Sequence, residues 1–120
     1  MKRAVMLAFY SLFLGSNLLC GGERVALVIG NDEYQHASKL SAAVNDATAV
    51  SLALQGLNFK VIRAMNAGVE TMLEAVNKLK QTANGAESVL VYYAGHGIES
   101  GGVNYLVPVD ARLEREVQLK

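Results

Sequence analysis

Runs of apolar residues, separated by polar and glycine-containing segments, predict the strands of this protein. Residues 24–30 form a continuous apolar run closed by Gly30, which is typical of a strand buried on both faces of a parallel sheet. Residues 59–63 alternate between apolar and polar side chains and predict a second, short strand. Residues 88–93 form another apolar run with high β propensity and predict a third. A brief fourth strand is expected at residues 105–107, just before Pro108.

Two segments between these runs repeat their apolar residues at helical spacing. Residues 42–57 predict a helix, and Gly56 supplies the signal for its carboxyl end. Residues 69–83 show the same periodicity and predict a second helix. Asn66 is the N-cap expected from residue type, and Asn84-Gly85 is expected to end this helix.

The order strand, helix, strand, helix, strand predicts the α/β class. Such an order gives an open parallel sheet with right-handed crossovers and helices on both faces. Ligand sites in open α/β sheets form outside the carboxyl ends of the strands. Three segments leave those ends, at residues 30–40, 64–68 and 94–102, and we expect the last to be a glycine-rich loop. The site should therefore lie where these three segments meet.

The first 22 residues have the layout of a secretory signal peptide. Lys2 and Arg3 form a positive start, residues 4–14 are largely apolar, and small and polar residues follow. The apolar stretch is shorter than the roughly 20 residues that a membrane span requires. We therefore expect residues 1–22 to be a signal peptide, with an uncleaved anchor or a wrongly assigned start codon as the alternatives.

Removal of this segment would leave residues 23–120 as one domain of an exported protein. That protein would be periplasmic or secreted, or membrane-anchored if the segment stays attached. Cys20 raises the alternative of a lipid attachment site. Leu19 precedes it, however, where such sites resemble one another in having a small residue.

Composition excludes several classes of function. The chain has 120 residues, of which 52% are hydrophobic and 18% charged, as suits one small globular domain. Its 11 basic and 11 acidic residues cancel and form no basic stripe, which argues against a nucleic-acid partner. Two histidines and one cysteine are too scattered for a metal site. Ser100 stands where a dinucleotide motif needs its third glycine, so no cofactor is expected.

His96 is the strongest candidate for chemistry. Gly95 and Gly97 flank it just beyond the third predicted strand, and we expect them to leave its side chain uncovered and open to a substrate backbone. An imidazole in such a place can take a proton from a thiol and return it to a leaving amine at neutral pH. A loop histidine beside a turn is an equal alternative on local features. His36 is expected to be a solvated loop residue.

Asp46 is the second candidate. It lies in the first turn of the first predicted helix, where an aspartate ordinarily interacts with the helix dipole. The functional alternative is a carboxylate facing the crevice, where it can bind an Arg or Lys side chain through charge-assisted hydrogen bonds.

Five local motifs occur in an order that resembles the caspase-like domains of bacterial paracaspases and metacaspases. They lie at residues 25–31, Tyr34, residues 44–46, residues 92–97 and residues 104–110. The Tyr-Tyr-Ala-Gly-His-Gly string at residues 92–97 is the most specific of them. The resemblance runs from about Arg24 to the end of the chain.

This resemblance implies a cysteine endopeptidase with a Cys-His dyad and a caspase-like fold. It makes His96 the general base and acid, and it assigns the backbone N–H of Gly97 to the oxyanion hole. It places Asp46 in the pocket for the substrate residue before the cleaved bond, which implies protein or peptide substrates with Arg or Lys there. Ala43 stands where metacaspases often carry a cysteine, so that part of the pocket departs from their pattern. Nothing in the sequence indicates a calcium loop.

The nucleophile of this family follows the histidine by roughly 50 residues, at about position 145. The sequence ends at Lys120, and Cys20 precedes the first strand in a segment expected to be removed. We therefore expect the chain to be a fragment of the large-subunit part, without peptidase activity of its own. Without the next strand, residues 88–93 would present a bare apolar edge, so residues 23–120 alone should aggregate or form oligomers.

Two other functions remain open at this point. One is a non-catalytic pseudo-peptidase or protein-interaction module, and the other is an unrelated small α/β ligand-binding domain. A cysteine after another apolar strand, downstream of Lys120, would distinguish the enzyme from the module.

Overall fold

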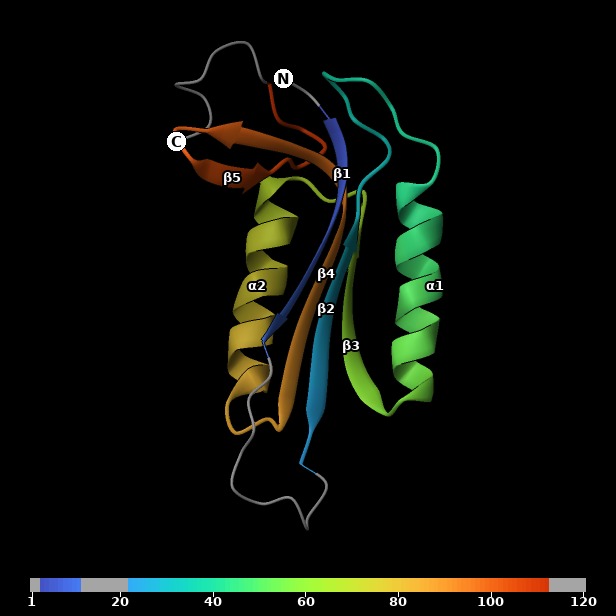
Figure 1. Ribbon diagram of the computed structural model, residues 1–120, viewed down its shortest axis with the longest axis vertical. Helices are drawn as coiled ribbons and strands as arrows, with labels where there is room; N and C mark the ends of the chain where they lie inside the picture. The colour runs from blue at the N-terminus through green and yellow to red at the C-terminus, as the bar shows by residue number, and fades with distance from the viewer. Residues whose placement is uncertain (1–2, 12–21, 113–120) are drawn as a thin grey trace.

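A computed structural model describes residues 3–11 and 22–112 of the chain (Figure 1). The elements follow one another as β1 (Arg3–Ser11), β2 (Arg24–Gly30), α1 (Ala43–Gly56), β3 (Phe59–Met65), α2 (Val69–Ala83), β4 (Ser88–Ser100) and β5 (Val103–Leu106).

The strands form one open, mixed sheet. Its order is β1-β4-β2-β3, and β5 pairs with the far part of β4. β2 runs parallel to both of its neighbours, with Arg24 opposite Phe59 on one side and Ser88 on the other. β1 and β5 both run antiparallel to β4. The predicted open α/β sheet is confirmed, and its parallel part consists of β2, β3 and β4.

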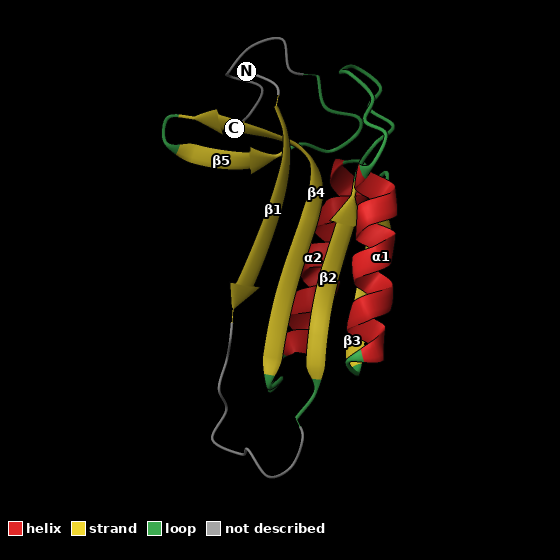
Figure 2. Ribbon diagram, turned by 45° about the vertical axis from the view of Figure 1, so that its right-hand side comes forward, coloured by secondary structure: helices red, strands yellow, loops and turns green. Residues whose placement is uncertain are grey.

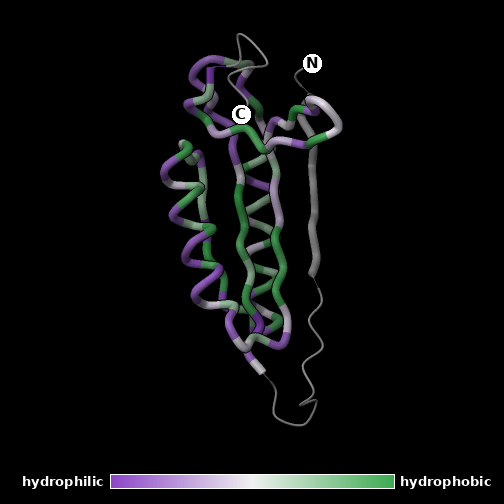
Figure 3. Tube along the Cα trace, turned by 90° about the vertical axis from the view of Figure 1, so that its left-hand side faces the viewer, coloured by the Kyte–Doolittle hydropathy of each residue, from purple (hydrophilic) through white to green (hydrophobic). Residues whose placement is uncertain are grey.

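The two helices cover opposite faces of the sheet, as predicted (Figure 1). Residues 25, 27 and 29 of β2 pack with Ala75 and Leu79 of α2, whereas residues 26 and 28 pack with α1. Successive side chains of a strand point to opposite faces, so this alternation requires a helix on each side. β2 is buried from residue 25 to residue 30, which confirms the double-sided burial expected from its apolar run. The hydropathy colouring in Figure 3 shows the same apolar centre.

The predicted loop at residues 94–102 is wrong. β4 continues as a strand to Ser100, and Figure 2 shows it running past the end of β2 to meet β5. The extension has a partner because β5 folds back and pairs with it, from Gly97 opposite Leu106 to Ser100 opposite Val103. The turn between them uses Gly101 and Gly102, whose φ angles are 58° and 79°. Gly95 and Gly97 had suggested a loop, but both lie within β4.

One of the three predicted helix signals is also wrong. The end of α1 at Gly56 is confirmed, although the left-handed residue beyond it is Asn58, with φ of 65°. Asn66 does not cap α2, whose N-cap is Gly68. The N–H of Val69, the first residue of α2, instead donates to the carboxylate of Asp110 at 3.1 Å. Asp110 lies 41 positions later in the sequence. The end of α2 at Asn84-Gly85 is confirmed, with Gly85 at φ of 77°.

The backbone of residues 3–11 forms β1 and pairs along β4, from Arg3 opposite Gly97 to Ser11 opposite Val89. Most of the remaining predicted signal peptide, and residues 113–120, lie outside the described part of the chain. Cleavage of residues 1–22 and the division into a leader and one domain stay predictions. Within the described ranges, no helix has the length and apolar character needed to cross a bilayer.

Candidate active site

The segments that follow β2, β3 and β5 meet at one edge of the sheet, next to His96 of β4. The predicted meeting place is therefore found, but the third segment is the one after β5 and not a loop at residues 94–102. Asn31, directly after β2, is fully buried and joins the other two. Its side-chain oxygen accepts the N–H of Ala67 at 2.9 Å, beyond β3. Its side-chain nitrogen donates to the carbonyl of Val107 at 3.3 Å, beyond β5. One buried amide therefore uses both its donor and its acceptor to hold this edge of the sheet together.

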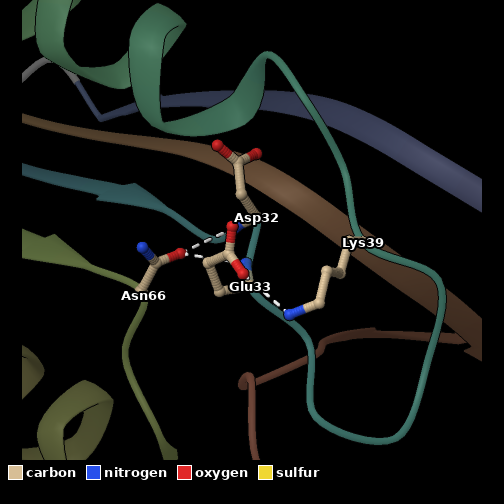
Figure 4. Close-up of polar contacts among 4 residues, drawn as sticks. All are labelled: Asp32, Glu33, Lys39 and Asn66. Atoms are coloured by element: carbon tan, nitrogen blue, oxygen red, sulfur yellow. Dashed lines mark hydrogen bonds and ion pairs between the residues drawn. The ribbon is translucent and has the colours of Figure 1, made fainter.

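The segment at residues 31–42 is fixed at both ends (Figure 4). The Asn66 side-chain oxygen accepts the N–H groups of Asp32 at 2.9 Å and Glu33 at 3.1 Å. The Asp32 carboxylate accepts the N–H of Ala43 at 2.8 Å and of Val44 at 3.0 Å, which caps the start of α1. Sequence reasoning missed this cap because Asp32 lies 11 residues before Ala43, outside any local capping spacing.

His96 lies on β4 and is buried, with 4% of its surface exposed. The expectation that its flanking glycines leave it uncovered is wrong. Its ring lies beside that of Tyr34, with centroids 4.4 Å apart and planes tilted by 55°. The cover comes from residues 31–42, a segment distant in sequence that folds over the end of β4.

The ring nitrogens of His96 have different environments. Nε2 lies 2.7 Å from the backbone carbonyl of Ser38. A carbonyl oxygen can only accept, so Nε2 carries a proton in this contact. Nδ1 is buried and has no hydrogen-bond partner among the described residues. In the neutral ring with this tautomer, Nδ1 carries the free lone pair and is the acceptor nitrogen of the imidazole.

Gly95 makes room for two tyrosine hydroxyls. A Cβ at this position would lie 2.5 Å from the hydroxyl oxygen of Tyr93 and 2.7 Å from that of Tyr34. Real Cβ atoms do not approach oxygens so closely, so the glycine is explained by packing beneath β4 and not by access for a substrate. Burial raises the pKa of Tyr93 and that of Tyr34, so both hydroxyls keep their protons.

Asp46 lies in the first turn of α1, half-buried. Burial and, after it, the charge of Asp46 raise the pKa of Tyr92, which places this carboxylate near the α1-facing side of β4. Tyr92 and His96 are four residues apart on the same strand, and alternation puts both on that side. Asp46 and His96 therefore share a face of the sheet, and the assignment of Asp46 to a substrate pocket stays a prediction.

Gly97 follows His96 and has strand neighbours on both sides. It is paired with Leu106 of β5 and with Arg3 of β1. Its role as a backbone donor to an oxyanion stays a prediction.

No group of three or more His, Cys, Asp and Glu side chains suited to a metal occurs among the described residues. A surface hollow lined by Glu23, Arg24, Asn58 and Lys60 lies at the amino ends of the strands, away from His96.

Known proteins are similar in sequence to this chain. Residues 23–119 match the caspase domain family. Human mucosa-associated lymphoid tissue lymphoma translocation protein 1 is 37% identical over 89 residues, and its mouse homologue gives the same figures. That match covers 74% of this chain and 11% of the human protein. A paracaspase from Dictyostelium discoideum is 29% identical over 93 residues, covering 72% of this chain and 23% of the relative. The chain thus corresponds to a small part of each relative.

Proposed function

This chain belongs to the caspase domain family, and we propose that it is the histidine-bearing part of a cysteine endopeptidase. The observation that carries the proposal is the state of His96. Its Nε2 is held at 2.7 Å by the Ser38 carbonyl, and its Nδ1 is buried without a partner among the described residues. A buried nitrogen without a hydrogen-bond partner lowers the stability of the fold, so stability gives no reason for this arrangement. A catalytic role, in which Nδ1 has to accept a proton during the reaction, would explain why it is left unpaired.

In the proposed reaction, Nδ1 of His96 removes the proton from a cysteine thiol supplied from outside residues 1–120. The thiolate attacks the carbonyl carbon of the peptide bond, and the negative charge moves to the carbonyl oxygen. The Gly97 N–H stabilises this oxyanion together with the N–H of the nucleophile. His96 then returns the proton to the leaving amine as the C–N bond breaks, and water hydrolyses the thioester. Throughout, the Ser38 carbonyl accepts from Nε2 and stabilises the positive imidazolium.

The proposed substrates are proteins or peptides with Arg or Lys before the cleaved bond. Asp46 is the residue that would select them, because burial and, after it, the charge of Asp46 raise the pKa of Tyr92, and strand alternation puts Tyr92 on the same face of the sheet as His96. A carboxylate recognises guanidinium or ammonium by charge-assisted hydrogen bonds, and it repels an acidic side chain. The peptidase would thus prefer basic residues at this position.

Export fits the same proposal. A strand that brings the nucleophile beside His96 needs the edge of β4 that β1 occupies, from Arg3 opposite Gly97 to Ser11 opposite Val89. Two strands cannot pair with one edge at the same time. Cleavage of residues 1–22 as a signal peptide would remove β1 and leave this edge available. The mature enzyme would act in the periplasm or outside the cell.

The test uses the protein purified from its native source. Its intact mass should exceed 12.8 kDa, and it should cleave peptides after Arg or Lys but not after Asp. His96→Ala should abolish cleavage, whereas His36→Ala, a change at an exposed histidine, should leave it intact. Asp46→Ala should mainly remove the preference for basic residues, and an unchanged preference would show the pocket assignment to be wrong.

A mass at or below 12.8 kDa together with no cleavage would overturn the proposal. The domain would then be a non-catalytic module, and the arrangement around His96 would have to serve binding.

A further inference from the structure

We propose that Tyr34 and Tyr93 are positioning residues for His96. Their hydroxyl groups bind the backbone N–H and C=O of the histidine and so fix its peptide groups. The inference rests on the proposed peptidase function for its biological meaning, but its physical content can be measured without any activity.

The contacts join the backbones of His96 and Val107 in a reciprocal way. The Tyr34 hydroxyl accepts the N–H of His96 at 2.8 Å and donates to the carbonyl of Val107 at 2.9 Å. The Tyr93 hydroxyl donates to the carbonyl of His96 at 2.6 Å and accepts the N–H of Val107 at 3.3 Å. The two hydroxyl oxygens lie 3.1 Å apart.

Each hydroxyl uses its single proton and its lone pairs in this arrangement. A tyrosine hydroxyl has one donor and can accept as well, so one carbonyl and one N–H satisfy it. Both tyrosines are buried, with exposed fractions of 2% and 0%. Water is therefore not available to replace either contact. Loss of the Tyr34 hydroxyl leaves the His96 N–H without its acceptor, whereas loss of the Tyr93 hydroxyl leaves the His96 carbonyl with the N–H of Val107 alone, at 3.1 Å.

The same segment that supplies Tyr34 also supplies the carbonyl that orients the histidine ring. Ser38 contacts Nε2 at 2.7 Å, and the ring of Tyr34 packs beside the imidazole. The backbone of His96 is thus fixed at its N–H and its C=O, and its ring is fixed at Nε2. What remains free is Nδ1, the atom that has to accept a proton in the proposed reaction. Gly95 is part of this arrangement, since any side chain there would displace both hydroxyls.

Phenylalanine substitutions separate positioning from packing. Tyr34→Phe and Tyr93→Phe keep the rings and remove only the hydroxyl oxygens. Tyr92→Phe is the matched control, because this hydroxyl is also buried on β4 but has no hydrogen-bond partner among the described residues. Nuclear magnetic resonance on the whole 120-residue chain can then report the imidazole tautomer and the amide exchange rate of His96. The Val28 amide on β2 serves as a reference for global opening.

The wild-type chain should show His96 with Nε2 protonated and Nδ1 unprotonated. Tyr34→Phe should accelerate exchange of the His96 amide by roughly tenfold relative to Val28 and produce a mixture of tautomers, because a buried donor loses its acceptor. Tyr93→Phe should likewise give a tautomer mixture, and Tyr92→Phe should change neither signal. A purely structural role would slow or speed exchange at both amides together and leave the tautomer unchanged. That outcome, or wild-type His96 signals in both variants, would overturn the inference.

Two further measurements keep the test decisive. If neither variant folds, the wild-type chain still tests the contacts. The hydroxyl protons of Tyr34 and Tyr93 should be protected from exchange with water, and rapid exchange would refute the contacts. If the native protein cleaves peptides, Tyr34→Phe should lower kcat with little change in KM, and Tyr105→Phe on β5 should change neither. Absence of cleavage in the wild type would overturn the proposed function while leaving the tautomer result valid.

Discussion

The cap that Asp32 provides for α1 gives a sharp prediction, because its two hydrogen bonds span 11 and 12 positions of the chain and can be perturbed with a near-isosteric change. Asp32→Asn keeps one acceptor oxygen for one of the two N–H groups at 2.8 and 3.0 Å. The amide nitrogen that replaces the second oxygen is a donor, and it would face the other N–H. The change therefore leaves a poorly hydrated donor unpaired and also removes a negative charge from a helix N-terminus.

The expected loss of unfolding free energy is about 2 kcal/mol. Removal of a side-chain N-cap costs about 0.5–2 kcal/mol, and the charge near the helix dipole adds about 0.3–1 kcal/mol. For a domain of this size, 1 kcal/mol corresponds to a shift in Tm of about 4–8 °C, so Tm should fall by about 10 °C. Urea unfolding followed by circular dichroism measures the first quantity, and a thermal melt measures the second.

Glu33→Gln is the matched control, because it neutralises the neighbouring carboxylate. Glu33 pairs with Lys39 at 2.7 Å, but the two side chains are 59% and 65% exposed (Figure 4). Exposed ion pairs contribute about 0–1 kcal/mol, so this variant should be close to wild type. Equal losses for the two variants would refute the cap, as would unchanged exchange protection of the Ala43 and Val44 amides in Asp32→Asn.

Three other perturbations test the same architecture. Asn66 has φ of 51°, so Asn66→Ala should cost about 1 kcal/mol more than Asn66→Gly in urea unfolding, because glycine tolerates this conformation; equal costs would mean that the backbone relaxes. Gly95→Ala should destabilise by about 1–3 kcal/mol through collision with the Tyr93 hydroxyl, and more than Gly56→Ala, where a Cβ meets nothing within 4 Å and φ is not positive. Because burial raises the pKa of Tyr34 and Tyr93 above the usual 10.0, the folded state keeps protons that the unfolded state loses at alkaline pH. Stability should therefore be constant below this pH and fall above it by up to about 1.4 kcal/mol per pH unit for each tyrosine, and Tyr93→Phe should flatten that decline in pH-dependent urea titrations.

The sequence by itself determined the parallel core and the identity of the candidate residues. The apolar run at residues 24–30 predicted a strand buried on both faces, because the order of apolar and polar residues along a short segment determines which faces of the element can be buried. The two helices followed from helical periodicity for the same reason. Where three segments leave the carboxyl ends of parallel strands, their meeting follows from topology alone. His96, Gly97 and Asp46 were found as members of motifs whose order is itself a sequence property.

Only the tertiary structure decided how those residues are used. The glycines around His96 have the local signature of a loop, but β5 pairs with the extended β4 and turns them into strand. Burial of His96 by residues 31–42 could not be predicted, because its cover is supplied by Ser38, 58 positions away. The Asp32 cap and the Tyr34 contact with His96 span 11 and 62 positions. Hydrogen bonds at such separations leave no periodic trace in the sequence, because they depend on where the folded chain places their partners.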